Sequence, residues 1–218
     1  MQGLTKVIKR FLADRRLGQS FSDKVRYLVN SNITDWDNRA EKCGKSLLAA
    51  ICFRETALAS NRRKDSKIYQ PIGFYYAMFH MSLAMLWINP RVKASDLKNI
   101  HHGKLFSLVD SELVRHNYVG ADYYERLKWL RVLRESCNYS FGYRDSLDAD
   151  LSRAAKNTYE SFDDALTFIH EVLAASKSLF KVQVGIADGF GDDILETYLT
   201  DKHKEKVNKY LVDHGLSA

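Results

Sequence analysis

The chain has 218 residues, of which 45% are hydrophobic and 12% aromatic, enough to bury a real core and to argue against global disorder. No stretch approaches about 18 uninterrupted apolar residues, so no membrane span is expected, and the first ten residues lack an apolar segment of signal-peptide length. Cys43, Cys52 and Cys137 show no paired spacing, and we interpret them as buried thiols of a cytoplasmic protein rather than as zinc ligands.

The net charge of +6 is unevenly distributed along the chain. Residues 1–70 hold 15 Lys and Arg against 7 Asp and Glu, whereas residues 71–218 hold 18 against 20. The basic surplus therefore lies in the first third and suggests an anionic partner, with nucleic acid as the first candidate. A solvated basic helix face, or a patch that meets an acidic partner protein, would give the same asymmetry.

Only two prolines, Pro71 and Pro90, interrupt a chain rich in leucine, alanine, lysine and glutamate, and no long alternating pattern indicates strands. The sequence therefore predicts an all-α protein. In chain order, the predicted helices cover about residues 4–16, 22–30, 34–59, 73–88, 123–139, 153–180 and 193 onwards, and a loop passes into a further helix at 99–109. Gly44 weakens the third of these helices. Asn89-Pro90 ends the apolar core helix 73–88, because proline cannot extend the helical hydrogen bonds.

Three segments between these helices are predicted to be irregular. Residues 61–67 form a basic polar connector, which marks the boundary between an N-terminal extension and the main domain. The segment with Asp145, Asp148 and Asp150 lacks the glycine and the final glutamate of a calcium loop, so we expect a solvated loop. The glycine-containing segment 185–191 follows no strand and lacks the Lys-Ser/Thr ending of a phosphate loop, so we expect a turn. No cofactor is therefore expected.

Three segments, at 74–80, 101–106 and 130–139, occur in an order that resembles the HEPN domain superfamily. The segment Phe74-Tyr-Tyr-Ala-Met-Phe-His80 is similar to the first core helix of that family, and His101-His-Gly-Lys-Leu-Phe106 to the loop and helix that follow. Leu130-Arg-Val-Leu-Arg-Glu-Ser-Cys-Asn-Tyr139 resembles the helix that ends in an Arg-x-x-Ala-Asp-Tyr-like element. The likeness covers about residues 70–175.

The resemblance implies an up-and-down helical bundle over residues 69–180, with a basic helical extension at 1–68 and a helical extension at 181–218. Family members often form dimers and act in toxin–antitoxin pairs, phage defence or RNA processing. Nuclease members cut RNA without a metal through an Arg-x4–6-His motif. This chain departs from that motif, because the position five residues after Arg134 is Tyr139 rather than histidine.

The candidate catalytic residues are Arg134, Asn138 and Tyr139. Arg134 and Asn138 share one helix face, with Arg131 one turn before them. An arginine offers a planar fork of donors suited to phosphate, Asn138 could orient a phosphate or a base, and Tyr139 could stack or donate a proton. A polar cluster that fixes the register of the bundle or seals a dimer is the alternative interpretation.

Further basic side chains are candidates for contact with nucleic acid. His101, His102 and Lys104 precede or open the predicted helix at 99–109, although the two histidines also suit a solvated loop or a helix cap. The basic connector adds Arg62, Arg63 and Lys64. His80 lies beside the apolar face of its helix, so we expect a core or interface histidine.

Two hypotheses follow. In the first, the chain is a HEPN-like RNA- or nucleotide-associated protein of a prokaryotic defence or toxin–antitoxin-like system. It would form a homodimer, and any RNA cleavage would make it an atypical metal-independent ribonuclease. In the second, it is a non-catalytic helical module that binds a partner effector protein encoded nearby. The basic surplus favours the first hypothesis, and the missing histidine of the motif favours the second.

Overall fold

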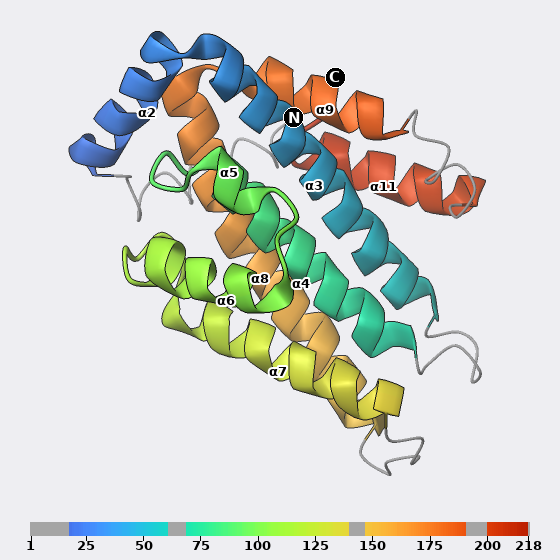
Figure 1. Cartoon of the computed structure of the whole chain (residues 1–218). Coiled ribbons are helices and arrows are strands. Elements are labelled where there is room, and N and C mark those ends of the chain that lie inside the picture. The colour runs from blue at the N-terminus through green and yellow to red at the C-terminus, as the bar shows by residue number, and fades with distance from the viewer. Residues whose placement is uncertain (1–17, 61–68, 140–146, 191–199, 218) are drawn as a thin grey trace.

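The computed structural model describes residues 18–60, 69–139, 147–190 and 200–217, and every element in these ranges is a helix (Figure 1). The all-α class is therefore confirmed for the part of the chain that is described. In chain order the elements are α2 (Gln19–Ser31), α3 (Ile33–Ser60), α4 (Gln70–Trp87), α5 (Ala94–Leu97), α6 (His102–Leu108), the π-helix η2 (Val109–Val114), α7 (Ala121–Tyr139), α8 (Leu147–Ser176), α9 (Leu179–Phe190) and α11 (Asp201–Asp213).

Helix α4 is the central element of the bundle. It packs against α3, α7 and α8, and Figure 1 shows the axes of α3, α4 and α7 roughly aligned, with α4 antiparallel to the other two. Helices α9 and α11 pack on α3, and α2 packs on α8. One continuous hydrophobic core contains residues from Phe21 to Leu216, so it includes described parts of all three segments, 1–68, 69–180 and 181–218. Whether these segments are separate domains stays a prediction.

Helices α3 and α9 cross so closely that their glycines are required. A Cβ atom on Gly44 would overlap the carbonyl oxygen of Val182, and one on Gly185 would overlap the carbonyl oxygen of Glu41. The prediction of a turn at 185–191 is therefore wrong up to residue 190, because the glycines serve helix contact rather than a change in chain direction. Gly44 likewise lies within a continuous helix, and the predicted helix 34–59 is confirmed as α3.

Two other predicted boundaries are corrected. The helix predicted at 153–180 is two helices, since α8 ends at Ser176 and Lys177 takes the left-handed backbone conformation (φ 56°) before α9 begins. Asp148 and Asp150 are not in a loop but in the first turn of α8, where a carboxylate compensates the positive end of the helix dipole. Helix α2 begins at Gln19 rather than at Ser22. The predicted helix 4–16, the connector 61–67 and Asp145 lie outside the described residues.

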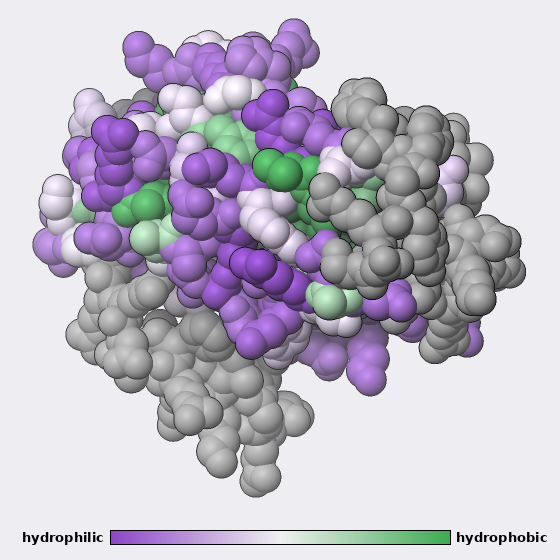
Figure 2. Space-filling view, turned by 90° about the horizontal axis from the view of Figure 1, so that it is seen from below, coloured by the Kyte–Doolittle hydropathy of each residue, from purple (hydrophilic) through white to green (hydrophobic). Residues whose placement is uncertain are grey.

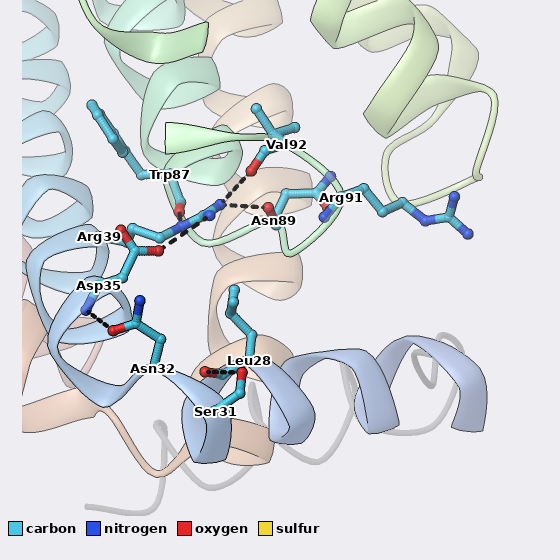
Figure 3. Close-up of polar contacts among 9 residues, drawn as sticks. All are labelled: Leu28, Ser31, Asn32, Asp35, Arg39, Trp87, Asn89, Arg91 and Val92. Atoms are coloured by element: carbon cyan, nitrogen blue, oxygen red, sulfur yellow. Dashed lines mark hydrogen bonds and ion pairs between the residues drawn. The ribbon is translucent and has the colours of Figure 1, made fainter. Parts of the chain in front are cut away.

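A buried arginine holds the turn that follows α4 (Figure 3). Arg39 of α3 donates hydrogen bonds to the carbonyl oxygens of Trp87, Asn89 and Val92 at 2.8, 2.7 and 2.8 Å. The Asn89 side chain is fully buried, and its Nδ2 donates to the carbonyl oxygen of Glu112 in η2 at 3.1 Å. The end of α4 is thus joined to α3 on one side and to η2 on the other. This joint sets the position of the segment that carries α5 and α6.

The surface is mostly polar. On the face seen from below the view of Figure 1, hydrophilic residues predominate among those coloured, and hydrophobic residues form small separate patches (Figure 2). Among the described residues, no helix combines the length and the hydrophobicity that a membrane span requires.

Candidate functional site

Three helices converge on Tyr75, a fully buried residue of α4. Its hydroxyl oxygen lies 2.6 Å from Nδ1 of His102, the first residue of α6. On α7, the guanidinium carbon of Arg134 lies 4.7 Å from the centre of the Tyr75 ring, a cation–π contact. Tyr75 therefore brings together a histidine and an arginine that the sequence analysis selected separately.

Two arginines of α7 share one carboxylate beside this tyrosine. Arg131 Nε donates to Oε1 of Glu135 at 2.8 Å, and a terminal nitrogen of Arg134 lies 3.4 Å from the same oxygen. The Arg131 guanidinium also lies over the ring of Phe106, 5.6 Å from its centre. Arg134 is only 12% exposed, whereas Arg131 is 43% exposed and faces solvent. We call Tyr75, His102, Arg131, Arg134 and Glu135 the Tyr75 cluster.

The Arg134 guanidinium is not fully satisfied by this arrangement. Its Nε is buried, and no hydrogen-bond acceptor for it is present among the described residues. Two positive groups therefore face one carboxylate, and the cluster keeps an excess of positive charge and of donors. An anion with several acceptor oxygens would complement both properties.

The environment determines the protonation of the cluster. Burial raises the pKa of Tyr75 to about 12, against the opposing effect of the two arginines, so the phenol is neutral at physiological pH. Partial burial, followed by the charges of Arg134 and Arg131, lowers the pKa of His102, so its imidazole is also neutral. The hydrogen bond from Arg131 lowers the pKa of Glu135 and keeps that side chain ionised.

These states decide what His102 can do. In the tautomer in which the Tyr75 hydroxyl donates to Nδ1, the ring proton is on Nε2, and His102 offers a further donor to an anion. As a general base, His102 would first have to release Nδ1 from Tyr75 or transfer its ring proton. The observed geometry is therefore better suited to anion binding than to proton abstraction.

The remaining predicted site residues are distributed as follows. His101 is exposed and caps α6, since its Nδ1 accepts a hydrogen bond from the backbone N–H of Lys104 at 3.2 Å. The Lys104 ammonium group is directed to Asp96, 2.9 Å away, and is not part of the Tyr75 cluster. Asn138 and Tyr139 occupy the last turn of α7, but their side chains lie outside the described residues.

The basic cluster of the connector, Arg62, Arg63 and Lys64, also lies outside the described residues. His80, expected in the core or at an interface, is half-buried and stacks on Phe53 of α3, with ring centres 5.4 Å apart. Burial lowers the pKa of His80 to about 4, so this ring is neutral at physiological pH.

Sequence reasoning missed Tyr75 and Glu135 as members of the site. Tyr75 lies in the apolar helix predicted at 73–88, where no pattern distinguishes it from the core residues around it. Glu135 follows Arg131 by four residues, a spacing that places the two side chains on one helix face, so an ion pair could have been predicted. No comparable spacing relates Tyr75 to His102 or to Arg134, because the three lie on different helices.

Within the described ranges, no three His, Cys, Asp or Glu side chains gather in a way that could hold a metal ion. No protein-family model, no curated protein and no solved structure matches this chain. A functional assignment therefore depends on the residues of the chain itself.

Proposed function

We propose that this chain is a HEPN-like RNA-associated protein that binds an RNA phosphate at the Tyr75 cluster. The observation that carries the proposal is the convergence of His102 and Arg134 on the buried Tyr75, next to the exposed guanidinium of Arg131. Both residues belong to segments that resemble HEPN elements. The basic surplus in residues 1–70 adds a second, longer-range attraction for a polyanion.

The chemistry of the cluster supports phosphate as the ligand. Guanidinium groups bind phosphate through paired N–H donors, and Arg131 is exposed enough to reach a ligand without rearrangement of the core. Glu135 takes the place of an anion in the free protein. A phosphate that approaches Arg131 and Arg134 would compete with that carboxylate, so Glu135 should limit the affinity.

Metal-independent RNA cleavage is a second candidate function, favoured by the position of His102 and Arg134, which both contact Tyr75. This histidine lies on α6, so it could stand in for the one that α7 lacks five residues after Arg134. Arg134 would then stabilise the charge on the phosphate, and Asn138 and Tyr139 remain predicted contributors at the end of α7. Cleavage requires His102 to exchange its hydrogen bond with Tyr75 for one with the attacking hydroxyl.

The context that we propose is a homodimer in a prokaryotic defence or toxin–antitoxin-like system. Cys43 and Cys52 are buried thiols that form no disulfide within the described residues, which supports a reducing cytoplasm. The alternative is a non-catalytic module for a partner effector protein. In that case the arginines and Glu135 would serve a polar protein contact, and RNA affinity would be absent.

The test is binding and cleavage of a mixed RNA pool by the purified protein in the presence of EDTA. Arg131→Ala should weaken binding and reduce the slope of log affinity against log salt by about 0.7–1, the amount expected for one lost phosphate contact. Glu135→Gln should strengthen binding, because it removes the competing carboxylate. Arg115→Ala, directly after η2, is the matched control, since Arg115 is exposed, lies outside the basic first third of the chain, and pairs with Asp110 rather than with the cluster.

Each outcome has a defined meaning. Binding without cleavage, with these two variants shifting affinity in opposite directions, supports an RNA-associated protein. Cleavage in EDTA that is lost in His102→Ala supports the second candidate. If the wild-type protein binds no RNA, or if Arg115→Ala weakens binding as much as Arg131→Ala, the Tyr75 cluster is not an RNA site.

A further inference from the structure

We infer that the RNA bound at the Tyr75 cluster is single-stranded, with its bases stacking on a strip of aromatic rings that leads from His102 to Phe53. This inference rests on the proposed function. It adds the structural class of the RNA and the surface that recognises it. We call Phe53, Tyr76, His80 and His102 the aromatic strip.

The strip is continuous across three helices. The His102 ring of α6 lies 6.2 Å from the ring of Tyr76 on α4, and Tyr76 lies 5.4 Å from Phe53 on α3, with 29° between the ring planes. Phe53 also stacks on His80 at 5.4 Å, with the planes only 8° apart. Phe53 is 37% exposed, a large fraction for a phenylalanine, and Tyr76, His80 and His102 are half-buried. The rings thus form a surface that solvent can reach.

Charge divides this surface into two parts. Arg131 and Arg134 lie at the His102 end, where His102 and Arg134 both contact Tyr75. At the Phe53 end the ring of His80 is neutral, because burial lowers its pKa to about 4 and it carries no proton at physiological pH. A neutral aromatic surface offers nothing to a phosphate but is well suited to the flat face of a nucleobase. One end therefore suits the backbone of a nucleic acid, and the other suits its bases.

Only an unpaired strand presents both parts at once. In an A-form duplex the bases stack on one another and their faces are not available to protein side chains. A single strand has unstacked bases next to its phosphates, and aromatic rings beside a basic group are the usual means of binding it. A second copy of this chain could cover the aromatic strip instead, but the arginines at its end favour an anionic occupant.

The experiment compares a labelled RNA strand with the same strand annealed to its complement, by fluorescence anisotropy. Phe53→Ala should weaken single-strand binding by roughly five- to a hundredfold, the effect of losing one stacked base, and leave the salt slope unchanged. Phe53→Trp should retain binding, and its fluorescence should be quenched by the RNA. Phe180→Ala on α9, where the ring is 69% exposed, is the matched control for loss of a surface phenylalanine.

Failure of this inference can be distinguished from failure of the proposed function. If the duplex binds as tightly as the single strand, or if Phe53→Ala behaves like Phe180→Ala while Arg131→Ala still weakens binding, the inference is overturned and the phosphate site stands. If Phe53→Ala converts a dimer to a monomer in light scattering without a change in RNA affinity, a second copy covers the strip and the inference is again overturned. A wild-type protein that binds neither RNA overturns both proposals.

Discussion

Replacing Arg39 by methionine removes the donors that hold the turn after α4 and keeps an unbranched side chain of comparable reach. Arg39 is buried, and its guanidinium donates to three backbone carbonyl groups, those of Trp87, Asn89 and Val92 (Figure 3). In Arg39→Met these acceptors lose their partners while the packing around the aliphatic part of the side chain is largely retained. The variant therefore isolates the hydrogen bonds from the hydrophobic contribution.

The expected cost follows from two opposing effects. A hydrogen bond to a charged group contributes about 1.5–3 kcal/mol, so the sum over three such bonds is the upper limit of the stability that Arg39→Met can remove. Against this, methionine avoids the desolvation of the guanidinium, which lowers the pKa of Arg39. Water can also reach the turn, because its Pro90 is half-buried and its Arg91 is exposed. We therefore expect the free energy of unfolding to fall by about 3 kcal/mol.

Urea unfolding followed by far-UV circular dichroism measures this change, with an unchanged denaturant slope as the sign of an intact fold. Asp35→Asn is the control, because Asp35 is half-buried and its carboxylate lies 4.0 Å from the Arg39 guanidinium. That substitution should cost less than about 1 kcal/mol. The reasoning is refuted if Arg39→Met costs less than about 1 kcal/mol, or if Asp35→Asn costs as much as Arg39→Met.

Three further predictions concern the crossing of two helices, a buried hydrogen bond and the pH dependence of stability. Gly44→Ala should lower the free energy of unfolding by about 2–3 kcal/mol, because the added methyl group would overlap with α9. The control Gly103→Ala should raise it by up to about 1 kcal/mol, because its Cβ would make only ordinary contacts. Equal effects of the two substitutions would contradict the close crossing of α3 and α9. Ser178→Ala removes the hydroxyl that accepts a hydrogen bond from the indole N–H of Trp36 at 2.7 Å. The free energy of unfolding in urea should fall by about 1–2 kcal/mol. An unchanged free energy would mean that this hydrogen bond contributes nothing to stability. Between about pH 6.5 and 4 the unfolded state binds a proton at His80 that the folded state does not, so the free energy of unfolding should fall as the pH falls through this window. His80→Phe should make this fall smaller. If the pH profile of the variant equals that of the wild type, His80 is not the group responsible.

Much of the fold could be predicted because the spacing of apolar residues and the position of proline indicate a helix from its own segment of sequence. The helix predicted at 73–88, from apolar spacing and the proline at 90, is confirmed as α4, which ends at Trp87. The long helix expected at 123–139 is confirmed as α7. The error at 185–191 has a physical reason. A glycine permits both a turn and the close approach of a second helix, and only the neighbouring helix, here α3, decides between them.

The site was less predictable than the helices that carry it. Arg131, Arg134 and His102 could be selected because they lie in the segments 101–106 and 130–139 on which the resemblance rests, and because arginine is suited to binding phosphate. Tyr75, which joins two of them, is surrounded in sequence by core residues and gives no signal of its own. Lys104 was expected to contact an anion, but Asp96, eight residues earlier, supplies its partner through a loop geometry that spacing does not reveal.

The position of His102 depends on two attachments of the same segment to α4. At one end of α4, Tyr75 binds the His102 ring directly. At the other end, Arg39 and Asn89 tie the turn after α4 to α3 and to η2, which follows α6 without a break. A short helix held at both ends in this way has little freedom to change the distance between its imidazole and α7. A motif defined by spacing along one helix requires the arginine and the histidine to be close in sequence, whereas this chain brings them together through the packing of three helices. The absence of a histidine after Arg134 therefore does not by itself remove an arginine–histidine site.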